Sequence, residues 1–176
     1  MDTMQAIRER KSYRGPFLET PIPREDLKEI AEAGFLAPSG CNTQTTKFIA
    51  VDDPKLARKL AEIYGFDWAK TAPAAILVLS QKLQARNGAY YDVEDFSAAA
   101  ENILLAVTAK GYATTWIQGQ IDYEGKAEKM GELLGVPEGM TVEIYLPIGI
   151  PAQETKPPKK QAFEERVWFN HYGTTE

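Results

Sequence analysis

Residues 74–80 read Ala-Ala-Ile-Leu-Val-Leu-Ser, so both faces of an extended chain would be apolar here. A short continuous apolar run of this kind is typical of a central strand that is covered on both sides. The stretch from Asp95 to Lys110 follows, and its small and aliphatic residues wrap most of the way round a helix. A strand covered on two faces and a mostly apolar central helix predict a layered architecture.

Helices and strands alternate through much of the chain, which favours an α/β or α+β arrangement of layers. Pro23 is well placed to open a helix that stops at residues 38–40, and Asp53-Pro54 is well placed to open another. The pair Asn87-Gly88 predicts a turn. Further helices are predicted over about 3–11 and over 123–134, and further strands over 47–51, 113–117 and 142–148, where Val142, Ile144, Leu146 and Ile148 alternate.

Composition narrows the class of protein. The chain has 176 residues, 44% of them hydrophobic, which is enough for one sizeable core. With one cysteine and one histidine, a chain can form neither an internal disulfide nor a zinc cage of thiolates and imidazoles. The longest apolar stretch, residues 72–79, is far shorter than a membrane span, and the N-terminus lacks a signal-peptide pattern. We therefore expect a single domain over residues 1–176, in the cytoplasm.

Charge is distributed unevenly along the chain. The total is −5, yet residues 1–14 and residues 155–166 each carry a net +2, which leaves −9 for the remainder. A net-acidic protein repels nucleic acid and anionic membranes over most of its surface, so we expect neither as a partner. Two basic ends on an acidic body favour a smaller anion, such as a phosphate group.

Few side chains suit catalysis without a cofactor. Cys41 is far in sequence from the only imidazole, His171, and we expect it to be a small buried thiol in a loop rather than a nucleophile. The acids Asp92, Glu94 and Asp95 suit a helix N-terminus better than a hard cation. No Walker A or G-x-G-x-x-G run occurs, which disfavours an ATPase or a dinucleotide-fold dehydrogenase. No metal site is expected.

An enzyme with so few acid–base groups would take its chemistry from a cofactor. The run Arg10-Lys11-Ser12-Tyr13-Arg14 offers two guanidinium groups, an ammonium and a hydroxyl within five residues, a set that suits one phosphate. The alternative is a helix C-terminus stabilised by cations, and the residues alone leave the two interpretations nearly even.

Several segments together resemble the FMN-dependent nitroreductase superfamily. Its members open with a short helix and an Arg-x-Ser-x-Arg-like phosphate motif, matched here by Ile7, Arg10, Ser12 and Arg14. A second motif, Ala-Pro-Ser-x-x-Asn-x-Gln, is matched by residues 37–44. Further similar segments are residues 95–106, 110–117, 133–137 and 147–151, so the resemblance extends from about Ile7 to Arg166.

The resemblance implies an α+β fold, a three-layer α/β/α sandwich with a mixed, mainly antiparallel sheet around a central helix. It implies a homodimer with two FMN sites at its interface, each built from both chains, and with exchanged C-terminal tails. Residues 151–176 would form an extended tail that packs on the partner subunit.

By similarity, the FMN contacts come from three groups of residues. The phosphate and the polar edge of the flavin are assigned to Arg10, Lys11, Ser12 and Arg14, assisted by Lys159 and Lys160 in the tail. The ring system is assigned, from the other chain, to Pro38, Ser39, Asn42 and Gln44. The loop facing the isoalloxazine is assigned to Ile117, Gln118 and Gly119, where a backbone N–H can donate to flavin N5.

Two positions depart from the family pattern. Thr45 and Thr46 stand where the family usually has Pro-Trp, and Gln161 stands where a second arginine is expected. The first departure concerns the shape of the loop, and the second concerns one phosphate contact, which Lys160 could supply.

The resemblance also implies a reaction. NADH or NADPH delivers hydride to flavin N5, leaves, and an electron-poor acceptor such as a nitroaromatic, a quinone or a free flavin takes the electrons in a ping-pong cycle. Two alternatives stay open within the superfamily, reductive dehalogenation of an aromatic substrate and fragmentation of the flavin. A third alternative, from another class, is an FMN-binding redox partner protein with little turnover.

Overall fold

The computed structural model describes residues 1–174. Three strands, β1 (Thr46–Val51), β2 (Ala74–Ser80) and β3 (Thr141–Ile148), form one antiparallel sheet in the order β1-β2-β3. All seven residues of β2 are buried, which confirms the central strand predicted from its apolar run.

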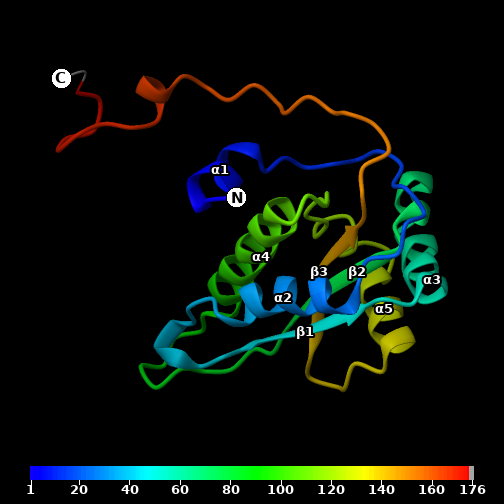
Figure 1. Ribbon diagram of the computed structural model, residues 1–176. Helices are drawn as coiled ribbons and strands as arrows, with labels where there is room; N and C mark the ends of the chain where they lie inside the picture. Colours follow the sequence, from blue (N-terminus) through cyan, green and yellow to red (C-terminus); the bar gives the residue numbers. More distant parts are fainter. Residues whose placement is uncertain (175–176) are drawn as a thin grey trace.

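Helices cover both faces of this sheet, giving the predicted α+β sandwich (Figure 1). Ile76 and Val78 of β2 pack with α2 (Arg24–Phe35) and α4 (Asp92–Ala109), while Leu77 and Leu79 pack with α3 (Pro54–Tyr64) and α5 (Lys126–Leu134). The strand therefore divides its side chains between two cores, as its period of two requires. The remaining helices are α1 (Thr3–Glu9) and the short 3₁₀ turns η1 (Gly40–Asn42), η2 (Asp67–Thr71) and η3 (Phe163–Glu165).

Strand β3 differs from the predicted alternation at one residue. Val142 packs with the α3/α5 core, whereas Ile144, Leu146 and Ile148 pack on the side of α2 and α4. The register shifts between the Val78–Ile144 and Leu79–Val142 pairs, so Glu143 is an extra residue in β3. A bulge of this kind reverses the facing of every residue beyond it, and a sequence pattern alone does not reveal it.

The predicted strand over 113–117 forms only isolated bridges. Ala113 pairs with Gly149 and Ile117 with Tyr145, both antiparallel, while Ser12 pairs with Thr114 in the parallel direction. The parallel component of the predicted mixed sheet is thus a single bridge within the described residues. This edge segment is nevertheless what attaches the N-terminal chain to the sheet.

Helix boundaries shift where the backbone leaves helical geometry. Helix α1 ends at Glu9 rather than near Lys11, because Arg10 adopts φ −56° and ψ 122°. Helix α5 begins at Lys126 rather than Tyr123, because Gly125 lies in the left-handed region and turns precede it. Gly135 stops α5 as predicted, with φ 69°.

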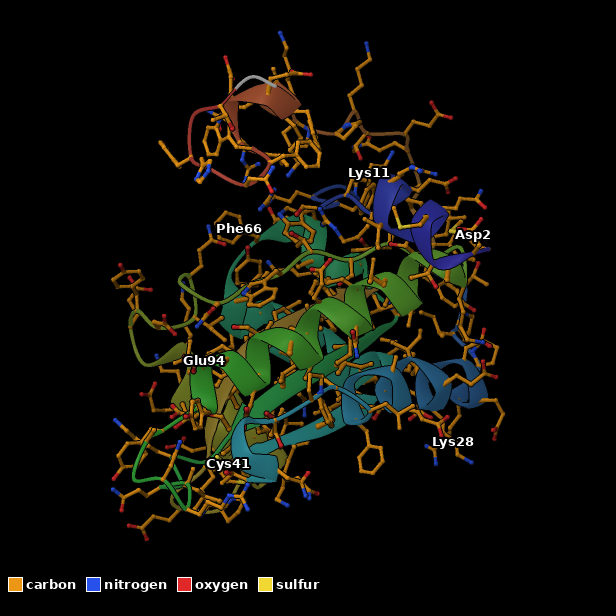
Figure 2. All side chains as sticks on the ribbon, turned by 90° about the vertical axis from the view of Figure 1, so that its left-hand side faces the viewer. Asp2, Lys11, Lys28, Cys41, Phe66 and Glu94 are labelled. Atoms are coloured by element: carbon orange, nitrogen blue, oxygen red, sulfur yellow. The ribbon has the colours of Figure 1, made fainter. Side chains whose placement is uncertain are left out.

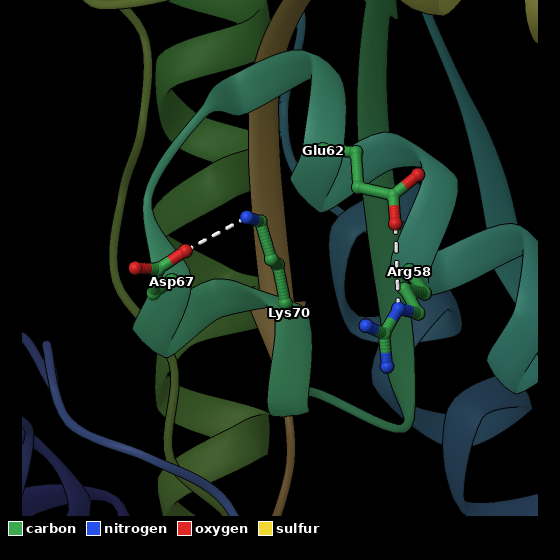
Figure 3. A network of polar contacts seen from close by, with 4 residues as sticks. All are labelled: Arg58, Glu62, Asp67 and Lys70. Carbon is green, nitrogen blue, oxygen red and sulfur yellow. Dashed lines mark hydrogen bonds and ion pairs between the residues drawn. The ribbon is translucent and has the colours of Figure 1, made fainter.

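Two ion pairs lie on the surface of the molecule at α3 and η2 (Figure 3). Arg58 and Glu62 pair along α3 at 3.3 Å, and Lys70 and Asp67 pair across η2 at 2.7 Å. Such exposed pairs typically contribute about 0.2–1 kcal/mol, so the two apolar cores rather than these charges hold the layers together.

Beyond β3 the chain leaves the body and passes above α1 as an extended tail (Figure 1). Three of its aromatic side chains are exposed, Phe163 by 61%, Phe169 by 67% and Tyr172 by 88%. Within residues 1–174, none of the helices combines the length and the apolar character needed to cross a bilayer.

Candidate functional site

The segment from Arg10 to Arg14 is extended and is fixed from one side only. Tyr13 is buried, its N–H donates to the Thr114 carbonyl at 2.9 Å, and its hydroxyl accepts from the Ala152 N–H at 3.1 Å. Successive side chains of an extended chain point to opposite sides, so Ser12 and Arg14 lie opposite Tyr13. Burial of the Tyr13 ring on one face therefore leaves the Ser12 hydroxyl and the Arg14 guanidinium on the opposite face of the segment.

The cations of this segment differ in their partners. The Lys11 ammonium donates to the Thr155 carbonyl at 2.6 Å, so its side chain is used to hold the start of the tail. The Arg10 Nε lies 3.7 Å from the Glu101 carboxylate on α4, a long and partly exposed contact. Within the described residues, the exposed Arg14 forms no ion pair. Its positive charge lies close enough to oppose the rise that burial causes in the pKa of Tyr64.

The predicted loop at Ile117 lies next to this segment. Ile117 exchanges backbone hydrogen bonds with Tyr145, at 3.3 and 2.9 Å, while the N–H groups of Gln118 and Gly119 have no protein acceptor within residues 1–174. The Tyr64 hydroxyl donates to the side chain of Gln120. The bridge between Ser12 and Thr114 places the basic segment beside the chain that leads into this loop.

Two buried hydroxyls without partners within residues 1–174 lie on the chain that is bridged to the basic segment. The hydroxyls of Thr114 and Thr115 are buried and make no hydrogen bond in the described part of the chain, although Thr114 is the bridge partner of Ser12. Buried polar groups are normally satisfied. These two hydroxyls are enclosed, so the donors open to a ligand are the two arginines, the Ser12 hydroxyl and the backbone N–H groups that lack an acceptor within residues 1–174. This set fits a phosphorylated, polar cofactor such as FMN.

The loop of residues 38–45 lines a different hollow. Pro38, Ser39 and Gln44 line a cavity of about 340 Å³ together with residues of α2, α4 and β1. Cys41 is exposed, which corrects the expectation of a buried thiol. Its φ of 52° holds its side chain on the outside of a tight turn rather than in the core.

One acid near this loop has a role that the sequence reasoning missed. Asp95, only 3% exposed, accepts hydrogen bonds from the Gly40 N–H and from the Thr45 hydroxyl, both at 2.7 Å. The sequence predicts Asp95, like Asp92 and Glu94, as an acid at a helix N-terminus, and all three lie in the first turn of α4. The available signal was helical spacing, because Asp95 precedes the apolar position Ala99 by four residues and shares its buried face.

The two groups of predicted contacts do not meet within one chain. Cys41 and Glu94 lie near one end of α4, whereas Lys11 lies near the other end (Figure 2). Asp95 bonds the loop, while Thr108 lines the same cavity of about 640 Å³ as Lys11. Asp95 and Thr108 are about 20 Å apart along the axis of α4. Lys159 and Lys160 are exposed in the tail and make no side-chain hydrogen bond or ion pair with residues 1–174.

Comparison with known proteins identifies the family of the chain. The sequence model of the Nitroreductase family matches residues 7–65 and 64–150. A protein of Archaeoglobus fulgidus, provisionally named NADH dehydrogenase/NAD(P)H nitroreductase, is 34% identical over 87% of both chains. The NADPH-flavin oxidoreductase of Vibrio harveyi is 28% identical, over 89% of this chain and 69% of that protein.

A solved structure extends the comparison to the fold. The FMN-dependent nitroreductase of Clostridium difficile R20291 superposes with a TM-score of 0.79 at 28% identity, covering 96% of this chain and 99% of that chain. Because the family match spans most of the sequence and the layers, the basic segment and the second motif all agree with it, the chain belongs to the nitroreductase family.

Proposed function

We propose that this enzyme is an FMN-dependent NAD(P)H oxidoreductase that reduces nitroaromatics, quinones or free flavins. The observation that carries the proposal is the donor face of Ser12 and Arg14, whose side chains make no hydrogen bond or ion pair within residues 1–174, on a segment bridged to Thr114 just ahead of the Ile117 loop. The names of the relatives support the same cofactors, since they mention NAD(P)H, flavin and FMN.

The enzyme would act as a homodimer in which each flavin lies between subunits. One chain would supply Arg10, Lys11, Ser12 and Arg14, with Lys159 and Lys160 of the tail, and Ile117, Gln118 and Gly119. The other chain would supply Pro38, Ser39, Asn42 and Gln44. This sharing accounts for the separation of the two groups along α4, which leaves neither group complete by itself.

Exposed apolar side chains on three helices and in the tail would be covered by a second subunit. Ile7 on α1, Phe35 at the end of α2 and Val93 at the start of α4 are 46%, 72% and 57% exposed. The tail adds Phe163 and Phe169, which a second subunit would cover.

Bound FMN would supply hydride acceptance and donation at its N5, and the protein would supply binding, orientation and electrostatics. Arg10 and Arg14 would neutralise the phosphate through charge-assisted hydrogen bonds, and Ser12 would add a hydroxyl donor. The Gln118 and Gly119 N–H groups would donate to the polar edge of the ring. The one histidine of the sequence, His171, lies in the tail, so water or weak donors would provide the protons for the acceptor.

The test is reconstitution followed by anaerobic reduction. Purified protein incubated with FMN and desalted should retain the visible absorption of flavin, and NADH or NADPH should bleach it. Adding a nitroaromatic or a quinone should then restore the colour. If the protein retains no flavin, the cofactor assignment is wrong. If FMN is bound but neither NADH nor NADPH bleaches it, the proposed NAD(P)H-dependent reductase activity is wrong.

A panel of acceptors would define the substrate class. Reoxidation by halogenated phenols, but not by nitroaromatics or quinones, would favour the dehalogenase alternative. Flavin that is bleached and reoxidised by none of these acceptors would favour a redox partner protein with little turnover.

A further inference from the structure

We propose that Asp95 is a positioning residue for the flavin, acting through Gly40 and Thr45 to hold the loop 38–45 in its binding shape. The inference rests on the proposed function, because that function places Pro38, Ser39 and Asn42 against a bound FMN. It assigns a role to Thr45, one of the two positions at which the chain departs from the family pattern.

Both carboxylate oxygens of Asp95 are committed to the loop. Oδ1 accepts from the Gly40 N–H and Oδ2 accepts from the Thr45 hydroxyl, each at 2.7 Å, and the Asp95–Thr45 bond is buried. One rigid helix residue therefore fixes the loop at two points, one on either side of Asn42 and Gln44. Hydrogen bonds to a buried carboxylate are among the stronger ones in proteins.

The loop needs such an anchor because its backbone is strained. Cys41, Asn42 and Gln44 have φ values of 52°, 57° and 53°, in the left-handed region that residues other than glycine rarely adopt. Strain of this kind persists only where the surroundings over-determine the conformation. Without the carboxylate, the loop would relax toward ordinary backbone geometry and its side chains would turn away from the cavity.

Hydrogen bonds within the loop and a contact with Tyr91 stabilise the same turn. The Thr43 hydroxyl donates to the Gly40 carbonyl at 2.6 Å, and the Ser39 hydroxyl accepts from the Gln44 N–H at 3.1 Å. Gly40 lies against the ring of Tyr91, so close that a Cβ there would meet the ring at 2.2 Å. The Asp95 bonds thus hold Gly40 in a place that only a glycine can occupy.

The consequence is a loop that is preorganised before the cofactor arrives. If only a fraction of molecules hold the binding shape, the apparent dissociation constant rises by the inverse of that fraction. Loss of one anchor that lowers this fraction to about one tenth would weaken FMN binding about tenfold. The effect concerns binding and ring orientation, and it is separate from the stability of the core.

The experiment compares FMN affinity in four full-length variants by flavin fluorescence titration, below their melting temperatures. Asp95→Asn and Thr45→Ala should each raise the Kd for FMN about tenfold, and Thr45→Ser, which keeps the hydroxyl, should restore it to within about twofold of the original. Glu94→Gln is the matched control, because it removes an exposed acid from the same turn of α4, and it should bind FMN like the parent.

Thermal melting of the flavin-free proteins separates positioning from general stability. The idea is overturned if Thr45→Ala lowers the Tm but leaves the Kd and the visible spectrum of bound FMN unchanged, or if Thr45→Ser binds as weakly as Thr45→Ala. Should Asp95→Asn fail to fold, the Thr45 pair decides the question alone. A parent protein that binds no FMN would instead overturn the proposed function, so the two failures are distinguishable.

Discussion

Arg10 and Arg14 lie on one short segment, yet their surroundings differ. Arg14 has no ionic partner among the described residues, whereas Arg10 is within 3.7 Å of Glu101. A phosphate must draw Arg10 away from that carboxylate but finds Arg14 available. We therefore expect Arg14→Ala to weaken FMN binding by about 1.5–3 kcal/mol, the usual value for a charged hydrogen bond, and Arg10→Ala by less.

Arg58→Ala provides the matched control for both variants. It removes an arginine that is exposed on α3 and paired with Glu62, on the other side of the sheet from α4 (Figure 3). Equilibrium titration with FMN should give the parent Kd for this variant. Equal FMN affinity in all three variants would refute the assignment of the phosphate to residues 10–14.

At the residue scale, the sequence indicates which chemical groups are present but not where each side chain points. The types of side chain at Arg10, Ser12 and Arg14 predict an anion site, and the fold bridges Ser12 to Thr114, just ahead of the predicted loop at Ile117. The sequence did not show that the Lys11 ammonium turns to the Thr155 carbonyl. That contact spans 144 positions in the chain, so only the folded tail creates it.

Packing between α2 and α4 depends on one small residue. Gly34 is buried, and a Cβ in its place would lie 2.7 Å from the Ile103 side chain and 3.0 Å from Phe48. Alanine there must push the two helices apart or force Ile103 from its rotamer. Overpacking of this kind costs about 1–3 kcal/mol. We expect Gly34→Ala to lower the free energy of unfolding in urea by that amount.

The matched control for this variant is Gly119→Ala, where a new Cβ meets no atom within 4 Å. Because Gly119 lies on the surface, its alanine variant should keep the parent stability. An unchanged urea midpoint in Gly34→Ala would mean that the helices are less tightly packed than the structure shows.

A hydrogen bond and two ion pairs also connect the C-terminal end of α4 to α2. The Tyr112 hydroxyl donates to Asp26, and the Lys110 ammonium lies 2.9 Å from Asp26 and 2.7 Å from Glu29. The hydrogen bond from Tyr112, and then that from Lys110, lowers the pKa of Asp26. Burial, reinforced by the bond to Asp26, raises the pKa of Tyr112 to about 12.

These directions define a pH window for the contact. Ionised Asp26 contributes fully above its ordinary pKa of about 3.9, and the contribution is lost as pH falls through the lowered value in the folded state. Protonated Tyr112 contributes fully below about pH 10. Tyr112→Phe should therefore lower the Tm throughout the neutral range, and the difference from the parent should shrink on acidification below about pH 4.

Calorimetric melts at several pH values test this expectation. Tyr123→Phe is the control, because Tyr123 is 71% exposed and its hydroxyl makes no side-chain hydrogen bond within residues 1–174. A Tm difference for Tyr112→Phe that persists undiminished at pH 2 would show that the hydroxyl does not act through the Asp26 carboxylate.

At the element scale, prediction succeeded where the residues of a segment determine its structure locally. Strand β2 is apolar on both faces, and Asp53-Pro54 caps α3 as predicted, the Asp53 carboxylate accepting from the Lys55 N–H at 2.8 Å. Prediction failed at Val142 and over 113–117. There the outcome depends on a bulge opposite β2 and on bridges to Ser12 and Gly149, contacts that lie far apart in sequence.

At the scale of the whole molecule, α4 decides how the site can be assembled. The loop that holds Asn42 is anchored at the first turn of this helix, and the basic segment lies along its later turns. A rigid helix of 18 residues cannot fold back to bring them together. Two antiparallel copies, however, would place the first turn of each helix beside the later turns of the other.

Mixed dimers test this arrangement directly. A chain carrying Arg14→Ala and a chain carrying Asn42→Ala would each form homodimers with two damaged sites. A dimer of one chain of each kind would contain one site with both defects and one site with none. After joint refolding and random pairing, about a quarter of all sites would be intact, so FMN binding and NAD(P)H-driven bleaching should return to about a quarter of the parent level.

Recovery in the mixture can only come from sites shared between chains, since neither variant supplies what its own chain lacks if all contacts are internal. Mixing without unfolding is the control, because homodimers that do not exchange should stay inactive. If the refolded mixture shows only the average of the two homodimers, the flavin is held within one chain, and the separation of residues 10–14 from residues 38–45 must then be closed by movement of the loop instead.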